Sequence, residues 1–185
     1  MKSTILFLIV SLTFVFANAQ TKKISREYNC FLSIKGTEYS VATVESWSKF
    51  KRVKSNLLFI NTKTGETKPI DFPDGANLRT ITQIKIDSLH INVVLIVANT
   101  IDWNEKKGIE WNDPKQIFIS SPSGNEIQQL TENNYFVNTW STNEFTGTLI
   151  VSGYFDTNKN NKKEKDEENS ILLYDLTTLK LKKKW

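Results

Sequence analysis

The sequence contains few of the side chains that most catalytic and metal centres require. Its 185 residues include one Cys and one His. Disulfide frameworks, Cys and His metal cages and charge-relay catalysis each need several such side chains in one place. Those classes are therefore disfavoured, and binding is the class of function that remains.

Glycine and proline are also scarce, with seven and four residues. This argues against collagen and low-complexity chains, and a composition of 39% hydrophobic, 11% aromatic and 24% charged residues is typical of a folded protein. The length suits one compact domain or a short array of repeats. We therefore expect residues 20–185 to form a single domain.

A long apolar run occurs only at the N-terminus, at residues 5–16, after the positive start Met1-Lys2. Ala17-Asn18-Ala19 follows and fits the small-x-small rule for cleavage before Gln20. This pattern predicts a signal peptide over residues 1–19 and a periplasmic or secreted protein; an amphipathic first helix is the alternative. Because no later stretch approaches roughly twenty apolar residues, no transmembrane segment is expected.

The single cysteine, Cys30, lies eleven residues beyond the predicted cleavage point. A bacterial lipid anchor would need a Cys at that point, so the lipoprotein interpretation is disfavoured. Beside Phe31 and Leu32, Cys30 is expected to be a buried small hydrophobe, with intermolecular pairing as the alternative.

The formal net charge is +4, and basic residues alternate with acidic ones except at residues 182–184. A weak positive balance of this kind predicts solubility more than it predicts a partner. Since basic runs with interleaved stacking aromatics are missing, nucleic-acid binding is not expected.

Short apolar runs rich in β-branched residues are spread along the chain, at residues 40–44, 57–60, 80–86, 91–97, 117–119, 148–151 and 171–173. Such runs predict β-strands, and the turn-forming segments 61–65, 72–75 and 121–124 separate some of them. No segment has a convincing 3.6-residue apolar stripe. The sequence therefore predicts an all-β fold of antiparallel hairpins.

The chain also matches itself when it is shifted by 54 residues without a gap. The aligned pairs are 95–97 with 149–151, Asp102 with Asp156, Asn104 with Asn158, Asp113 with Glu167, and 117–119 with 171–173. A looser third copy aligns residues 58–60 with 117–119 at a shift of 59, but it has no middle loop. Repeats of this length predict an array of about three β-meander units that bury their faces on each other.

One unit has a more specific pattern. Residues 116–131 read as a strand, a Gly turn and a second strand that ends in Leu130-Thr131, and Trp140-Ser141 follows. This order resembles the repeat of TolB-like (WD40-like) β-propellers, in which Leu-Thr leads into a Trp-Ser-Pro-Asp-Gly turn that opens the next blade. Residues 142–144 are Thr, Asn and Glu in place of Pro, Asp and Gly, so the hairpin is expected to differ. The resemblance implies propeller-like blades, and because propellers host many activities it implies no particular one.

Three units are fewer than the four to eight blades that close a propeller, and open sheet edges recruit other chains. Two hypotheses follow. Either the chain forms a compact open array, or a homodimer completes one ring.

An acidic loop at residues 156–167 has the ligand spacing of a calcium loop. The predicted Ca²⁺ ligands are Asp156, Asn158, Asn160, Lys162 through its carbonyl, Glu164 and Glu167. Position six, usually Gly, is Asn161, the non-Gly residue that best tolerates a left-handed backbone. The alternative is a solvated hairpin tip, which the four lysines within the loop favour.

The equivalent loop at residues 102–113 keeps acidic or amide residues at positions one, three and twelve but has Lys106 at position five. An ammonium cannot be a ligand. We therefore expect Lys106 to place its charge between Asp102 and Asp113, where a metal would otherwise lie.

Two tryptophans in this loop, Trp103 and Trp111, are candidate ligand-binding residues, because exposed indole faces stack on sugar rings or protein side chains. The alternative is that both hold the loop against the strands. Trp47, Trp140 and most phenylalanines are expected in the core.

An enzymatic function would have to use His90, Cys30 or paired carboxylates. His90 lies inside an apolar strand run and is expected to be a structural side chain and not a general base, and the hydrolase and phosphate-loop motifs are missing from the sequence. The favoured hypothesis is an exported, non-catalytic binding module with a protein partner in the periplasm or cell envelope, stabilised by one Ca²⁺. A carbohydrate-binding protein that uses Trp103 and Trp111 is the first alternative, and a hydrolase is the second.

Overall fold

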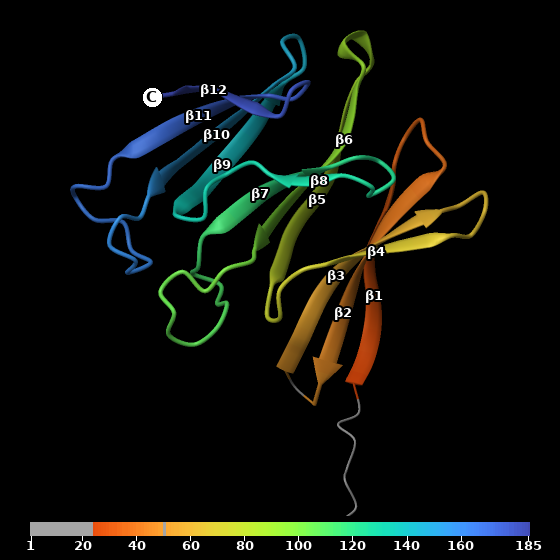
Figure 1. Ribbon diagram of the computed structural model, residues 1–185, viewed down its shortest axis with the longest axis horizontal. Coiled ribbons are helices and arrows are strands. Elements are labelled where there is room, and N and C mark those ends of the chain that lie inside the picture. The colour runs from red at the N-terminus through yellow and green to blue at the C-terminus, as the bar shows by residue number, and fades with distance from the viewer. Residues whose placement is uncertain (1–23, 50) are drawn as a thin grey trace, which may run out of the picture.

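The computed structural model describes residues 24–49 and 51–185, with the side chains of residues 51 and 52 left out (Figure 1). The predicted signal peptide, residues 1–19, lies outside them. Within the described residues, no helix has the length and apolar character needed to cross a membrane.

The chain forms three four-stranded antiparallel sheets, each a meander with its strands in chain order. The first contains β1 (Ile24–Ser33), β2 (Tyr39–Ser48), β3 (Lys51–Asn61) and β4 (Thr67–Asp71). The second contains β5 (Asn77–Ile86), β6 (Ile91–Asn99), β7 (Lys115–Ser120) and β8 (Ile127–Gln129). The third contains β9 (Tyr135–Asn143), β10 (Thr148–Phe155), β11 (Asn169–Asp175) and β12 (Lys180–Lys184). The all-β prediction is confirmed, and each sheet has the architecture of a propeller blade.

The internal repeat corresponds to these sheets. The 54-residue shift carries β6 onto β10 and β7 onto β11, which are the second and third strands of their sheets. The shift of 59 carries part of β3 onto β7, again third strand on third strand. Each predicted apolar run lies within a strand. The first sheet lacks the middle loop as expected, because β2 ends at Ser48 and β3 begins at Lys51.

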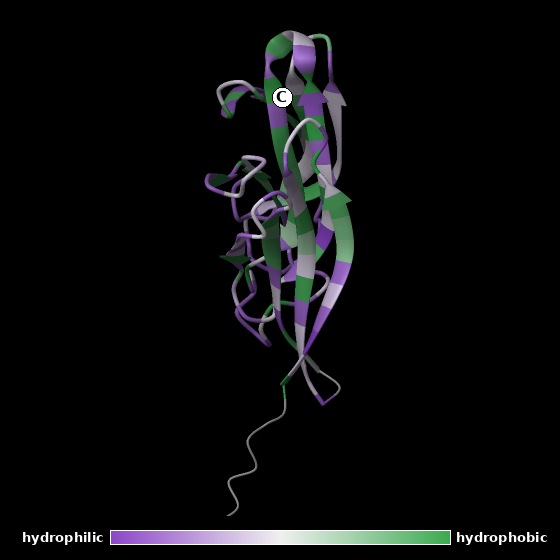
Figure 2. Cartoon of the chain, turned by 90° about the vertical axis from the view of Figure 1, so that its right-hand side faces the viewer, coloured by the Kyte–Doolittle hydropathy of each residue, from purple (hydrophilic) through white to green (hydrophobic). Residues whose placement is uncertain are grey.

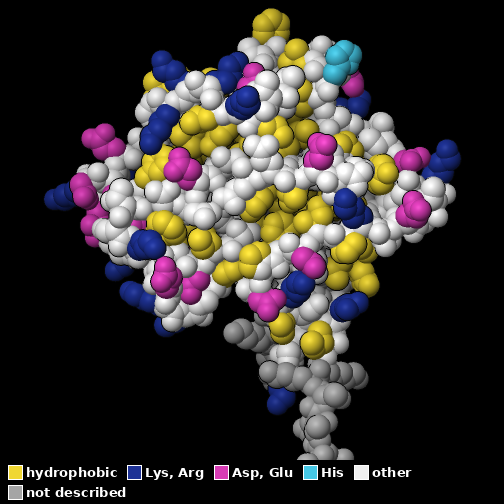
Figure 3. All heavy atoms as spheres, in the orientation of Figure 1, with side chains coloured by type: hydrophobic (Ala, Val, Ile, Leu, Met, Phe, Trp, Pro, Cys, Tyr) yellow, Lys and Arg dark blue, Asp and Glu magenta, His cyan; other side chains and the backbone are white. Residues whose placement is uncertain are grey.

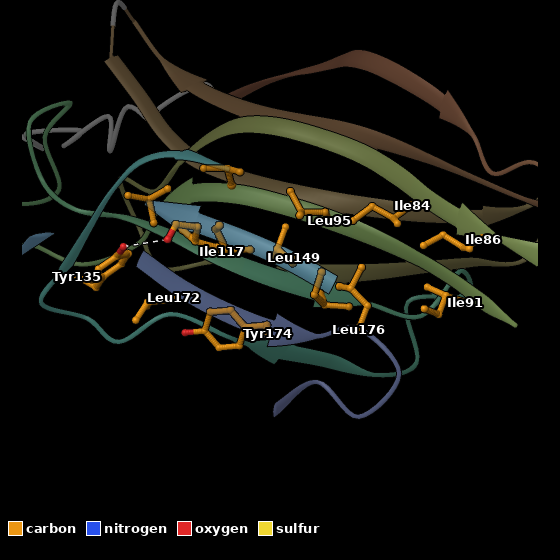
Figure 4. Close-up of a cluster of buried hydrophobic side chains, with 14 residues drawn as sticks. Ile84, Ile86, Ile91, Leu95, Ile117, Tyr135, Leu149, Leu172, Tyr174 and Leu176 are labelled. Atoms are coloured by element: carbon orange, nitrogen blue, oxygen red, sulfur yellow. Dashed lines mark hydrogen bonds between the residues drawn. The ribbon is translucent and has the colours of Figure 1, made fainter. Parts of the chain in front are cut away.

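The middle sheet is covered on both faces, and β6 shows why its sequence is continuously apolar. Leu95 and Val97 belong to a cluster shared with the third sheet, whereas Val94 and Ile96 belong to a cluster shared with the first. Since successive strand residues point to opposite faces, a strand buried on both sides needs apolar residues at every position. Figure 4 shows the first of these clusters between the second and third sheets.

Two buried tyrosines add polar links to that cluster. The Tyr135 hydroxyl lies 3.0 Å from the Ser170 carbonyl and 3.2 Å from the Val151 carbonyl, so it donates within the third sheet. The Tyr174 hydroxyl donates to the Leu130 carbonyl at 2.9 Å and so joins the third sheet to the second. Burial, helped by nearby negative charge, raises the pKa of Tyr174 to about 12.

Figure 2 shows apolar and polar residues interleaved along the strands. In the third sheet buried and more exposed positions alternate along β11. In β10, Leu149 and Val151 are buried while Ile150 between them is 38% exposed. Ile171 in β11 is also exposed. The third sheet therefore leaves these two isoleucines uncovered on its outer face, and the three sheets do not close into a ring. Charges of both signs are scattered over the face drawn in Figure 3.

Three expectations about single positions need correction. Cys30 is exposed, with a φ of 50°, at an irregularity in the pairing of β1 with β2. It is exposed because it lies in the edge strand β1, nearly all of whose residues are exposed. His90 is an exposed turn residue with a φ of 55°, between a short 3₁₀ helix (Asp87–Leu89) and β6, and not a strand residue. Of the two core tryptophans expected, Trp140 packs against the larger cluster, whereas Trp47 is half-buried outside either described cluster.

The Trp140-Ser141 segment lies inside β9, and the chain reverses only at residues 144–147. Gly147 has a φ of 63° there. The expected difference from the Trp-Ser-Pro-Asp-Gly turn is therefore confirmed, because the strand continues past the position where Pro would begin the turn.

Candidate functional site: paired acidic loops and a groove between two sheets

The two acidic loops occupy corresponding places in the fold. Residues 102–113 lie between β6 and β7, and residues 156–167 lie between β10 and β11, so each loop joins the second strand of a sheet to the third. Both project on the same side of the molecule (Figure 1). The correspondence of Asp102 with Asp156 is confirmed.

The second loop is organised around Asp156, which is completely buried. One carboxylate oxygen accepts the backbone N–H groups of Asn158 at 3.1 Å and Lys159 at 2.8 Å. The other accepts the N–H of Asn161 at 2.8 Å. Asn161 has a φ of 59°. The left-handed backbone predicted for position six is therefore present.

The remaining predicted ligands fall into two groups. The side-chain amides of Asn158 and Asn160 donate to Glu164 at 3.0 and 2.8 Å, so these three side chains converge. Glu167 is buried and instead accepts the N–H groups of Thr157 at 2.9 Å and Glu164 at 3.1 Å. The Thr157 hydrogen bond, against the effect of burial, holds the pKa of Glu167 below its ordinary value of 4.5.

Lys162, predicted to contribute its carbonyl, donates its backbone N–H to the Asn160 side-chain oxygen at 2.7 Å. The described residues include no group of three or more His, Cys, Asp or Glu side chains that could hold a metal ion. A cation in this loop would therefore need amide and carbonyl oxygens besides its carboxylates.

The first loop repeats this hydrogen-bond network, with Asp102 accepting the N–H of Gly108 at 2.7 Å. Asp113 is buried and accepts the N–H groups of Trp103 and Glu110 at 3.1 and 2.7 Å. The prediction for Lys106 is wrong. Its backbone N–H bonds Asp102 at 3.3 Å, but its exposed ammonium forms no ion pair with any carboxylate that the structure describes.

The cation that lies near the first loop is a lysine of the second loop. The Lys159 ammonium lies 3.2 Å from Glu105 and 4.9 Å from the centre of a Trp103 ring. The Asn161 side-chain amide also donates to Asp113 at 2.7 Å. The two loops therefore bind each other. The sequence analysis treated each loop separately and so did not predict these contacts.

The structure separates the two candidate tryptophans. Trp103 is half-buried at the contact between the loops, with the Lys159 ammonium over its ring. Trp111 is 80% exposed. Only Trp111 is presented to solvent for a ligand.

Trp111 borders a groove of about 480 Å³ between the second and third sheets. Side chains from β5, β6, β7, β9 and the first loop line it, including Arg79, Trp111, Lys115, Asn138 and Trp140. None of the described residues that line it is acidic. The groove therefore combines two indoles with two cations.

The two cations are held differently. The Arg79 guanidinium donates from Nε to the Asn99 side chain at 2.9 Å and from Nη2 to the Trp111 carbonyl at 3.4 Å. Lys115 is half-buried, and burial, followed by the charge of Arg79, lowers its pKa. Sequence reasoning missed Arg79 and Lys115, because they lie 36 residues apart and belong to no motif.

Comparisons with known proteins identify no family. No family model matches the chain, and no curated protein matches it. Among solved structures, Pyrococcus horikoshii acylaminoacyl peptidase aligns with 87% of this chain and 25% of its own, at 10% identity and a TM-score of 0.48. Cobalt-substituted Synechocystis apocarotenoid oxygenase aligns with 86% of this chain and 37% of its own, at 14% identity and a TM-score of 0.38.

The chain thus spans between a quarter and two fifths of the length of these structures. Similarities at these TM-scores carry no argument about activity. The strand pairing itself establishes the three blade-like sheets.

Proposed function

We propose that the protein is an exported, non-catalytic binding module that takes its ligand in the groove between the second and third sheets. The observation that carries the proposal is the pairing of Trp111 and Trp140 with Arg79 and Lys115 in one groove. Ligand grooves combine apolar surface with well-placed polar groups. In this groove two indoles and two valines lie beside two cations and three neutral polar side chains.

The TolB-like assignment is part of the proposal. Its support is the retained Leu130-Thr131 and Trp140-Ser141 pairs, together with three consecutive meanders. The export component rests on the pattern of residues 1–19 alone.

The non-catalytic component is supported by the placement of the two side chains that an enzyme would use first. Cys30 lies exposed on the first sheet, and His90 lies exposed in the turn that precedes β6 in the second sheet. A nucleophile and its base must lie within hydrogen-bond reach of each other. For the hydrolase alternative, no further feature of the described residues argues in its favour.

Calcium binding in the second loop is also proposed. The left-handed Asn161 and the convergence of Asn158, Asn160 and Glu164 support it. Because the described acidic side chains do not cluster, we expect a weak site, in the range of about 10⁻⁴ to 10⁻³ M that extracellular modules use.

The binding proposal can be tested by affinity capture from the envelope fraction of the producing cells, with and without a chelator. The wild-type chain should retain a partner that the Trp111→Ala, Lys115→Gln double variant loses. Equal retention by both chains would contradict a ligand site in the groove. If the chelator abolishes capture and the double variant does not, the loops, and not the groove, control binding.

A further inference from the structure

The groove between the second and third sheets holds two positive charges without a matching negative one. In the part of the chain that the structure describes, neither Arg79 nor Lys115 has a carboxylate oxygen within 4.0 Å. The two cations are near enough for the charge of Arg79 to affect Lys115. Arg79 is exposed and Lys115 is half-buried, so the two like charges repel each other most strongly at Lys115, and a bound anion would offset that repulsion.

Arg79 is oriented for such an anion. Its Nε bonds Asn99, a fully buried residue that in turn donates to the Asp113 carbonyl at 2.6 Å. A guanidinium has five N–H donors in a fixed plane, and only two of these are engaged here. The remaining donors suit a carboxylate, which a guanidinium binds with two parallel hydrogen bonds.

The indoles supply flat apolar surface next to these cations. Trp140 packs against the core cluster and is therefore held in place, and Trp111 presents most of its surface to solvent. The face of a sugar ring is a match for an indole face, since both are broad and weakly polar.

The strand edges at the groove disfavour a peptide. β5 and β9 are edge strands, and a peptide would bind them by adding a strand. Each edge is interrupted at the groove: Arg79 lies in the register shift between Leu78 and Thr80, and Asn138 lies in the shift between Val137 and Thr139. Bulges of this kind block regular strand addition.

We propose that this groove binds a saccharide that carries a carboxylate, with Arg79 and Lys115 on the carboxylate and the two indoles on the ring. The inference rests on the proposed function, because it names the ligand class of the same groove.

The test is calorimetric titration of the full chain with trigalacturonic acid and with its methyl ester, which has the same sugar rings without the charge. The acid should bind at least about tenfold more tightly than the ester. Lys115→Gln should weaken binding of the acid by about tenfold and leave the ester unchanged. Trp111→Ala should weaken both. Lys63→Gln removes the same charge from an exposed turn and is the matched control. Melting temperatures of the variants confirm folding.

Equal affinity for acid and ester, or equal effects of Lys115→Gln and Lys63→Gln, would overturn the proposal. Binding of an oligoglutamate peptide without binding of the saccharide would replace it with a peptide site, and binding of neither would also overturn it. If the capture experiment still depends on Trp111 and Lys115, the binding module stands while the ligand class is wrong. If neither capture nor calorimetric binding depends on them, both proposals fail.

Discussion

Gly153 has no room for a Cβ atom, because the neighbouring strand β9 approaches it closely. An added Cβ would overlap the carbonyl oxygen of Phe136 and lie 2.8 Å from the Tyr135 ring. The glycine lies at the register shift in the pairing of β10 with β9. The local path of these two strands, and hence the position of Tyr135 in the core, depends on the missing side chain.

Gly153→Ala should therefore lower the free energy of unfolding by about 1–3 kcal/mol, because the backbone of β9 has to move. Ser152→Ala, one residue away and half-buried, is the control and should change it by less than about 0.5 kcal/mol. Urea denaturation measures both values. Equal stability of the two variants would show that β9 adjusts without strain.

Among the loop residues, Glu167 makes the stability of the folded chain depend on pH. Its pKa is lowered in the folded chain, first by the Thr157 N–H. A carboxyl group with a depressed pKa contributes stability above its unfolded value, here 4.5, and loses that contribution as the pH falls through its folded value. The pKa of Asp175 is lowered in the same direction, mainly by the N–H groups of Thr178 and Thr177.

We expect wild-type stability to fall as the pH decreases below 4.5. Glu167→Gln should be less stable at neutral pH and show a shallower decrease in acid, with Asp175 accounting for part of the slope that remains. Thermal unfolding between neutral and acid pH tests this. Parallel curves for the two proteins would mean that Glu167 contributes nothing to the acid transition.

The paired loops also offer a matched test of calcium binding. Calorimetry with Ca²⁺ should find one weak site per chain, because the second loop has Asn160 where the first has Lys106. Asn158→Ala should abolish the heat of binding, and Asn104→Ala, the equivalent change in the first loop, should not. Two ions per chain, or none, would contradict the proposal.

Strands and loops were predictable from sequence to different degrees, for physical reasons. β6 was easy to find, because burial on both faces makes it continuously apolar. β1 was not singled out, because nearly all its residues are exposed and little selects for apolar side chains. The loop correspondence was visible in the 54-residue shift. The charge that approaches the first loop was not visible there, because Lys159 lies in the loop between β10 and β11 of another sheet.

The groove lay beyond sequence reasoning for a related reason. Arg79, Lys115 and Trp140 come from three different strands in two sheets. Only the packing of those sheets brings them together, and no spacing along the chain records that packing. Trp140 was expected in the core, and it does pack there while also bordering the groove.

The two outer sheets of the molecule leave apolar side chains exposed, whereas the middle sheet is covered on both faces. The third sheet exposes Ile150 and Ile171 on its outer face, and the first sheet exposes Tyr28 on β1. A further blade would cover these positions in a closed propeller. A second copy of the chain can supply one, which is the homodimer hypothesis.

Light scattering after size exclusion at micromolar concentration should therefore detect a dimer. Ile150→Lys should shift the chain to monomer, because the ammonium would be buried at the interface. Phe145→Ser removes an even more exposed apolar residue from the turn before β10 and should leave the dimer intact. A wild-type chain that is monomeric throughout would exclude the ring of two copies and leave the open array.

The two junctions between neighbouring sheets bury apolar clusters of different size. The second and third sheets share the larger cluster, the Tyr174 hydrogen bond and the cross-links between their loops. The first and second sheets share the smaller cluster, the hydrogen bonds of the Gln83 side chain with the Lys35 backbone, and one from Lys68 to Asn125. In denaturant or on heating, the first sheet should therefore unfold first and leave a partly folded state made of the second and third sheets. The groove lies wholly within that partly folded state, so the protein should still bind its ligand after the first sheet has unfolded.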